Sequence, residues 1–370
     1  MVPQVLAYVQ TEFPPEERGK AFGLYGIAFP IGGLAGPLLG GLLAGSDLFG
    51  LGWRSIFLVN VPVGVIAVIL IATLMPRRAA ADVDAAVDPA GILLAGAVVA
   101  GLMVPLVQGL QAGWPWWSIA LLVAVLPLAA IFVIHQRHRR RTGREPLIDP
   151  ALLRQPGFGS GLIVAWLFLA GMAVFFVLTL HLQEDLRFSP MITALSFLPA
   201  TLGIVGGNGL AMSVAARAGR GAVAIGIAAS LLGTTAIAII VLVAADRLRL
   251  WQLILPAVIV GLGLGLTLGK LVGTALQDVP ADSAGIASGV INTVLQLGSA
   301  TGIALVGSLY FARLHAGFPS AAAAAVALFV ASGLLVIALI ACRGLPVPRA
   351  TVEPSRRPAD AGVGQPASGG

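Results

Sequence analysis

Long uncharged runs alternate with short charged segments along nearly the whole chain. After a first charged loop there are ten such runs, at residues 21–44, 55–75, 89–110, 114–134, 156–180, 190–216, 221–245, 250–269, 283–312 and 316–342. Wound as an α-helix, which rises ~1.5 Å per residue, each run is long enough to cross a ~30 Å hydrocarbon core. The ~10-residue alternating segments of outer-membrane strands are absent. The pattern predicts an all-α polytopic membrane protein with ten complete transmembrane helices.

Composition supports a membrane protein and points away from an enzyme. Only 10% of the residues are charged, whereas soluble proteins carry roughly 25%. The single cysteine, Cys342, excludes a disulfide within the chain. The sequence contains no phosphate-binding Gly-x-x-x-x-Gly-Lys loop, His-Glu-x-x-His or cysteine pair. We therefore expect no enzymatic activity, no cofactor and no metal ion.

The positive charges predict an orientation. If the spans alternate, one set of loops holds sixteen Lys and Arg residues and the other set five. Because positive charge stays on the cytoplasmic side, the richer set and the C-terminal tail are expected to be cytoplasmic. The basic segment 135–144 either determines this topology or contacts anionic lipid headgroups. The pI of about 10.4 therefore needs no nucleic-acid partner.

One apolar run, 21–44, is unusually rich in glycine. Glycines recur at every fourth position on one flank, which leaves a groove where another helix can approach closely, and a proline predicts a bend. A plain packing helix is the alternative interpretation. The residues concerned are Gly32, Gly36, Pro37, Gly40 and Gly41, with Gly33 beside them.

The first ten residues form half a span. Their apolar, helical pattern reaches only ~15 Å before the charged loop begins. A signal peptide is not indicated, because a basic front and a small-residue cleavage site are missing. We expect this partial first helix to belong to a longer protein whose preceding helices bring the chain to the outer side.

Several runs together resemble a known family. These are FPPEERGKA at 13–21, the glycine-proline segment, GWRSIF at 52–57 leading into NVPVG at 60–64, and SGVINTVLQLG at 288–298. In this order they resemble the fourteen-span drug:proton antiporters of the major facilitator superfamily. The resemblance implies the major facilitator fold and identifies Gly32, Gly36, Pro37, Gly40 and Gly41 with the antiporter motif of the fifth helix. It also implies that the first three helices and the start of the fourth precede this chain.

The resemblance divides the chain into four parts. Residues 1–75 are the remainder of the N-terminal helical bundle, and 76–155 are a linker with two extra transmembrane helices and a basic cytoplasmic loop. Residues 156–342 form the C-terminal bundle, and 343–370 a disordered cytoplasmic tail. Three tryptophans, Trp114, Trp116 and Trp117, mark the outer turn between the two extra helices, as interfacial aromatic residues do.

The family implies a secondary transporter in the plasma membrane. It would export small hydrophobic or amphipathic compounds in exchange for protons, by alternating access, as a monomer in the lipid bilayer. Two alternatives stay open. One is a transporter of a single metabolite on the same fold, and the other is a fragment without transport activity.

The residues for proton coupling are harder to place. No carboxylate lies near the middle of a span, and the carboxylate that the family implies belongs to the first helix. Glu184 and Asp185, at the outer end of 156–180, are either a solvated loop pair or the nearest coupling candidates. The neighbouring His181 is expected to be interfacial. Lys270 either extends to the cytoplasmic headgroups or faces a cavity as an anion-binding cation.

Uncharged polar side chains also lie within the spans. Each could donate a hydrogen bond to a neighbouring helix, or line a substrate path. They are Asn60, Gln108, Asn208, Asn292 and Gln296. With Lys270, four of them form the candidate set for the substrate path or coupling: Asn60, Asn208, Asn292 and Gln296.

Overall fold

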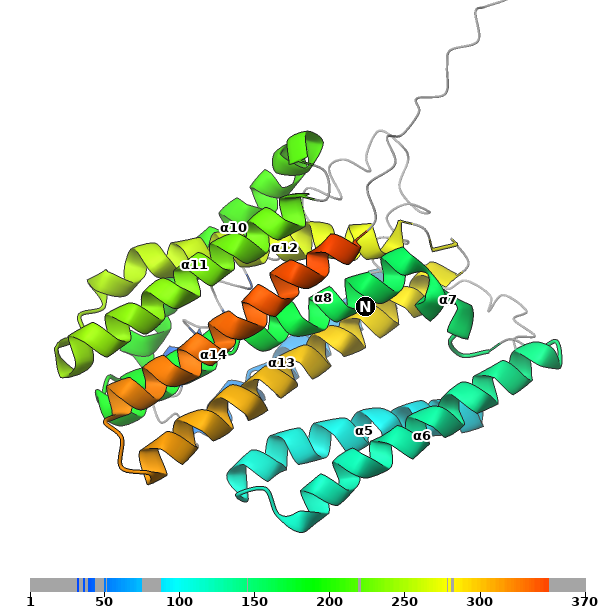
Figure 1. The fold of residues 1–370 in the computed structure, drawn as a ribbon, viewed down its shortest axis with the longest axis horizontal. Helices are drawn as coiled ribbons and strands as arrows, with labels where there is room; N and C mark the ends of the chain where they lie inside the picture. The colour runs from blue at the N-terminus through cyan, green and yellow to red at the C-terminus, as the bar shows by residue number, and fades with distance from the viewer. Residues whose placement is uncertain are drawn as a thin grey trace, which may run out of the picture.

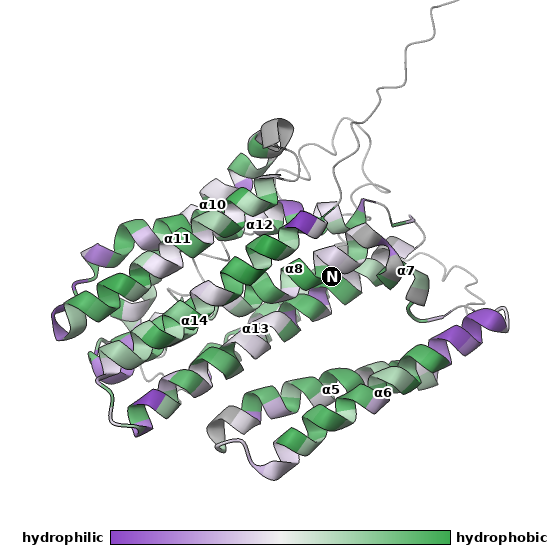
Figure 2. Cartoon of the chain, in the orientation of Figure 1, coloured by the Kyte–Doolittle hydropathy of each residue, from purple (hydrophilic) through white to green (hydrophobic). Residues whose placement is uncertain are grey.

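The computed structural model describes residues 32, 36, 39–43, 50, 52–74, 88–144, 146–218, 221–277, 279–280 and 283–345. Within these ranges every regular element is a helix, and nine helical segments are long and apolar enough to cross a membrane. They match nine of the ten predicted runs, and the remaining run, 21–44, lies mostly outside the described residues. Figures 1 and 2 show long, roughly parallel helices that are apolar over most of their length.

The helices follow one another with short connections. In chain order they are α3 (Ser55–Leu58), α4 (Asn60–Leu74), α5 (Pro89–Gln111), α6 (Trp116–Arg141), α7 (Pro150–Arg154), α8 (Pro156–Gly171), α9 (Val174–Leu180), α10 (Pro190–Ala218), α11 (Gly221–Ala244), α12 (Trp251–Leu276), α13 (Ala284–His315) and α14 (Ser320–Ala341). A π-helical turn, His181–Asp185, follows α9. Short 3₁₀ turns are Gly52–Arg54, Ala245–Arg247 and Cys342–Gly344.

Helices α8 to α14 form one bundle, in which α8 and α9 together make a single span. Helix α12 packs against α10 on one side and α11 on the other, while α14 packs against α11 and α8. Helix α13 lies beside α8 and α14. The apolar core contains fully buried side chains from several of these helices, among them Phe168, Ile227, Leu253 and Leu328.

Glycines allow α12 to approach both of its neighbours. A Cβ at Gly261 would meet the carbonyl oxygen of Ala200, and one at Gly265 that of Ile204, both on α10. On the other face, a Cβ at Gly263 would meet the backbone nitrogen of Ser230 on α11 at 2.5 Å. Because side chains are absent at these positions, the helix backbones come into direct contact, as in other membrane helix pairs. The glycines of α12 are therefore packing positions.

The two extra helices, α5 and α6, form a hairpin beside the bundle (Figure 1). Helix α5 packs against α13, and at the turn of the hairpin the indole Nε1 of Trp114 donates a hydrogen bond to the Ser308 hydroxyl at 2.8 Å. Trp114 has φ +57°, in the left-handed region. The hairpin is thus attached to the C-terminal bundle by a specific polar contact as well as by apolar packing.

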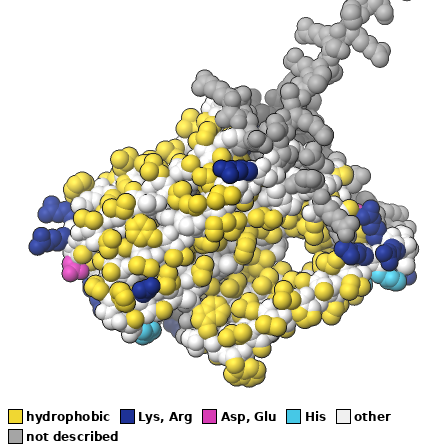
Figure 3. Space-filling model, in the orientation of Figure 1, with side chains coloured by type: hydrophobic (Ala, Val, Ile, Leu, Met, Phe, Trp, Pro, Cys, Tyr) yellow, Lys and Arg dark blue, Asp and Glu magenta, His cyan; other side chains and the backbone are white. Residues whose placement is uncertain are grey.

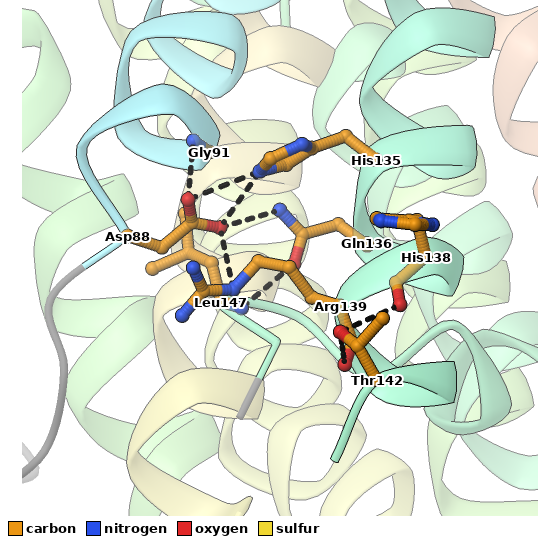
Figure 4. A network of polar contacts seen from close by, with 8 residues as sticks. All are labelled: Asp88, Gly91, His135, Gln136, His138, Arg139, Thr142 and Leu147. Carbon is orange, nitrogen blue, oxygen red and sulfur yellow. Dashed lines mark hydrogen bonds and ion pairs between the residues drawn. The ribbon is translucent and has the colours of Figure 1, made fainter. Parts of the chain in front are cut away.

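At its other end the two helices of the hairpin are joined by one buried carboxylate, that of Asp88 (Figure 4). Asp88 caps α5 by accepting from the Gly91 N–H at 2.9 Å, and its two oxygens lie 3.0 and 3.2 Å from His135 Nε2. Gln136 Nε2 donates to Asp88 at 3.2 Å, and Arg139 Nε lies 3.4 Å from the same oxygen. Gln136 in turn accepts from the backbone N–H of Leu147 at 2.7 Å. This network, the Asp88 cluster, joins both hairpin helices to the basic loop.

Asp88→Ala should destabilise the protein, because it removes the helix cap and the buried carboxylate that lies 3.4 Å from Arg139 Nε. Loss of a cap alone costs about 0.5–2 kcal/mol. Burial by itself raises the pKa of Asp88. Hydrogen bonds from His135, Gly91 and Gln136, with the charge of Arg139, outweigh burial and lower the pKa below its ordinary value. The stabilisation is therefore complete above the ordinary pKa of 3.8 and is lost as the pH falls through the lower folded-state value.

Thermal unfolding in detergent at neutral pH and below about pH 4 measures this effect. Asp149→Ala is the matched control, since Asp149 also caps a helix but pairs with the exposed Arg140 at 2.9 Å. The control should lose less stability, because exposed ion pairs contribute little. Equal losses in the two variants would contradict a special role for the Asp88 cluster.

The described surface fits a lipid environment. Figure 3 shows apolar side chains over the length of the helices, with arginine and lysine mainly toward the two ends. Large apolar residues are fully accessible on the outside, for example Val243 at 79% and Leu93 at 74% exposure. A surface of this kind is stable against lipid and would aggregate in water.

Candidate functional site

The glycine-rich helix of the N-terminal part approaches the second bundle at one described position. A Cβ at Gly41 would lie 3.0 Å from the Cβ of Ala194 and 3.2 Å from the Cα of Met191, both on α10. At Gly32, Gly36 and Gly40 a Cβ would meet no atom of the described residues within 4 Å. Gly33 and Pro37 lie outside the described residues. Within the described part, Gly41 is therefore the position where the motif and the C-terminal bundle come closest.

The polar residues predicted for a substrate path are not gathered at one point. Asn60, the first residue of α4, is exposed, and its side chain points back to α3, with Nδ2 3.5 Å from the Ile56 carbonyl oxygen. Asn208, on α10, is exposed and lies against α12, where a Cβ at Gly269 would be 3.1 Å from its Oδ1. Lys270 is the next residue on α12 and is half-buried. Asn208 and Lys270 thus lie on the same pair of helices, whereas Asn60 is separate.

Two further polar residues share a face of α13. Asn292 and Gln296 are four residues apart, so their side chains lie on one side of the helix, and both are exposed. Gly285 and Gly289 continue the same face, and a Cβ at either would meet nothing within 4 Å among the described residues. This small, polar face of α13 is therefore accessible and not used for packing inside the C-terminal bundle.

One aromatic residue beyond the predicted set is also accessible, on the side of α13 that packs against α8. Trp166, on α8, is 40% exposed, and its Nε1 donates to the Thr301 hydroxyl on α13 at 3.3 Å. Thr301 itself donates to the Leu297 carbonyl oxygen at 2.7 Å. The signal was present in the sequence, because Trp166 is the one tryptophan in the middle of an apolar run, away from the interfaces where tryptophan is usual.

The predictions for the C-terminal end of α9 need correction. His181 was expected to be interfacial, but its exposure is 0%. Its Nδ1 lies 2.8 Å from Asp185 Oδ2, so Asp185 is not part of a solvated loop pair. Glu184 is exposed, as a solvated loop residue would be. Burial of His181 results from the π-helical turn and from packing against α10 and α14, which the local hydropathy does not encode.

Metal binding is not indicated in the described part of the chain. Within it, no group of three or more His, Cys, Asp or Glu side chains is arranged to hold a metal ion. The remaining features are an accessible polar face, an exposed aromatic ring and close helix approaches. They suit reversible binding of a small molecule between helices more than bond-making chemistry.

Comparison with known proteins shows the family. The sequence profile of the Major Facilitator Superfamily matches residues 1–90 and 86–303, and the chain belongs to this family. Its transporters are multi-pass membrane proteins that handle small-molecule substrates and are generally not enzymes. The all-helical structure with its membrane-length segments agrees with this membership.

Named relatives include antibiotic transporters of actinobacteria. The chain is 39% identical over 316 residues to a probable actinorhodin transporter of Streptomyces coelicolor. The matched region covers 85% of this chain and 54% of that protein. It is 32% identical to a puromycin resistance protein of Streptomyces alboniger, over 84% of this chain and 60% of the relative. A tetracenomycin C resistance and export protein of Streptomyces glaucescens is 29% identical, over 86% and 58%. The chain thus spans about half the length of the curated relatives it matches.

Proposed function

We propose that the protein takes part in secondary active export of small hydrophobic or amphipathic compounds of the antibiotic type, in exchange for protons. The single observation that carries the proposal is family membership together with relatives named for antibiotic export and resistance. The accessible Trp166 ring and, separately, the polar face of α13 support it, because aromatic rings and hydrogen-bonding groups are the usual contacts of small amphipathic molecules.

Alternating access is the mechanism that the helix arrangement supports. The two bundles would rock about a central site and expose it to each side of the membrane in turn. The approach of Gly41 to α10 offers a smooth surface for this movement. In this proposal the C-terminal tail is cytoplasmic, the protein acts as a monomer in the plasma membrane and no nucleic acid is involved. Asn208, Lys270, Asn292 and Gln296 would line the substrate path, with Asn60 on the other bundle.

Export of a single compound is the second candidate function. It is favoured by the 39% identical relative, whose name contains one compound, actinorhodin. Relatives named for multidrug resistance, such as the Stp protein of Mycobacterium tuberculosis at 30% identity, favour a broader range. A panel of unrelated antibiotics separates the two, because a multidrug exporter protects against several classes and a single-product exporter against one.

Trp166→Ala should weaken transport of aromatic substrates. We would reconstitute the protein in proteoliposomes with an imposed pH gradient and measure uptake of fluorescent polycyclic aromatic antibiotics. Loss of an aromatic contact worth ~0.5–1.5 kcal/mol predicts an apparent affinity about 2- to 12-fold lower. Trp251→Ala, at the exposed end of α12, is the control and should leave transport unchanged. Gradient-independent uptake, or none for any compound, would refute proton-driven export.

A further inference from the structure

A buried polar cluster lies at the C-terminal end of α9, away from the accessible face described above. It consists of His181 and Asp185 in the π-helical turn and Tyr310 on α13. Asp185 Oδ2 lies 2.8 Å from His181 Nδ1, and it accepts a hydrogen bond from the Tyr310 hydroxyl at 2.7 Å. His181 and Tyr310 are 0% and 1% exposed. The cluster therefore joins two helices that are far apart in the sequence.

The imidazole of His181 is only half satisfied. Since a carboxylate oxygen can only accept, Nδ1 must be the donor in the contact with Asp185, and in the neutral ring Nε2 is a bare acceptor. Nε2 is buried and has no hydrogen-bond partner among the described residues. An orphaned buried acceptor costs about 1–3 kcal/mol, so its presence calls for an explanation.

The local backbone is also unusual. The segment His181–Asp185 is a π-helical turn, in which the Leu186 N–H donates to the His181 carbonyl oxygen at 3.0 Å. Arg187, directly after it, has φ +59°, a conformation that non-glycine residues rarely adopt. Single π-helical turns occur frequently at functional sites, and strained residues persist where the surroundings hold them in place.

The net charge of the cluster allows it to take up one proton. With a neutral imidazole the three side chains carry one net negative charge, that of Asp185, in a buried place. Glu184, on the same turn, is exposed and adds negative charge nearby. Helix α13 contributes Tyr310 itself and, farther along, Arg313, which lies over the Phe318 ring, and His315. Helix α14 has no charged residue, and α10 has only Arg217, at its opposite end.

We propose that His181, Asp185 and Tyr310 form a site that binds and releases one proton. The proton comes from water and joins Nε2 of His181. The imidazolium then donates a hydrogen bond from Nδ1 to the Asp185 carboxylate, which also accepts one from the Tyr310 hydroxyl. The net charge of the three side chains becomes zero. On release the same proton returns from Nε2 to water. Because Nε2 is sealed in this conformation, exchange requires α9 and α13 to separate locally.

This site supplies a protonatable group, which the middle of each described span lacks. Within the described spans no carboxylate lies at mid-membrane, and Asp185 is a half-buried carboxylate at the end of one span, Gly157–Asp185. A proton site that opens and closes with helix movement is the requirement for coupling a proton gradient to alternating access. Its role in coupling rests on the proposed export function. The existence of the proton site does not, and it can be tested without any substrate.

Histidine-selective ¹⁵N labelling provides the test, since the chain contains only four histidines. Each ring is assigned by the signal that disappears in its His→Gln variant. We expect the signal lost in His181→Gln to change between the positions of a neutral and a protonated ring when the pH is varied. In Asp185→Asn the response of this signal to pH should change, because the carboxylate that faces the imidazolium is gone. Tyr310→Phe should move the same signal, while the other three histidines keep their titration.

His315→Gln is the matched control, an exposed histidine at the end of α13, and it should leave the His181 titration unchanged. If His181→Gln fails to fold, Asp185→Asn and Tyr310→Phe still identify the ring. A His181 signal that stays at one position over the whole pH range in which the protein is folded would overturn the proposal. If the pH gradient drives drug uptake but the His181 signal does not change with pH, the export function is supported and the proton site is refuted. A titrating His181 without uptake would support the site and refute the export function.

Discussion

Gly265→Ala is expected to destabilise the folded protein by about 1–3 kcal/mol or more, the usual cost of overpacking. The added methyl would meet the Ile204 carbonyl oxygen and would lie 2.9 Å from the backbone nitrogen of Asn208, both on α10. Backbone atoms cannot rotate away as a flexible side chain can, so the two helices must move apart. Separation would also loosen the other side of α12, which packs on α11 through Gly263.

The control for this variant lies on the same helix. At Gly273 a Cβ would meet nothing within 4 Å among the described residues. There alanine should stabilise the protein by about 0.4–1 kcal/mol, because it restricts the unfolded chain without a clash. Thermal unfolding in detergent, followed by size-exclusion chromatography, compares the two. Shifts of opposite sign are expected, and a Gly265→Ala protein as stable as Gly273→Ala would refute the close approach of α10 and α12.

Gly41→Val is expected to lower transport at least tenfold while the protein is still inserted and folded. The two methyl groups would extend into the space between the glycine-rich helix and α10, where a Cβ alone already lies 3.0 Å from Ala194. Since this contact joins the glycine-rich helix to α10 and is not part of the described core, the change should hinder the relative movement of these helices more than their folding. A tenfold loss corresponds to about 1.4 kcal/mol on the rate-limiting step.

Proteoliposome uptake measures the loss, and the amount of folded protein in the membrane is determined in parallel. Gly40→Val is the control, because the neighbouring glycine has no described atom within 4 Å of its Cβ position. It should keep most of the transport activity. If both variants are equally impaired, helix flexibility and not the contact with α10 explains the need for glycine. Full activity of Gly41→Val would contradict a tight contact between the bundles.

The candidate site could be predicted from the sequence only in part. Asn292 and Gln296 were recognised as polar residues within a span, and their four-residue spacing places them on one accessible face of α13. Trp166 was missed, because nothing local says that its indole reaches Thr301, 135 positions away. Asn60 and Asn208 carry the same local signal, yet the described contacts place them on separate helix pairs.

The C-terminal end of α9 shows most clearly what local hydropathy does not determine. Hydropathy placed His181 at the end of a run and so at the interface. Its burial depends on packing against α10 and α14 and on a π-helical turn that a helical pattern does not reveal. A side chain near the end of a span is exposed or buried according to which neighbour covers it, and the neighbour is chosen by the tertiary fold.

The sequence by itself determined the number and approximate extent of the described spans and the family to which the chain belongs. These follow from hydropathy and short motifs, because a bilayer requires each spanning segment to be apolar and internally hydrogen-bonded. Only the tertiary structure decided which glycines contact backbone, where Asp88 finds its partners, and that His181 shares a carboxylate with Tyr310. Those contacts join residues from different helices, and their geometry arises only when the helices pack.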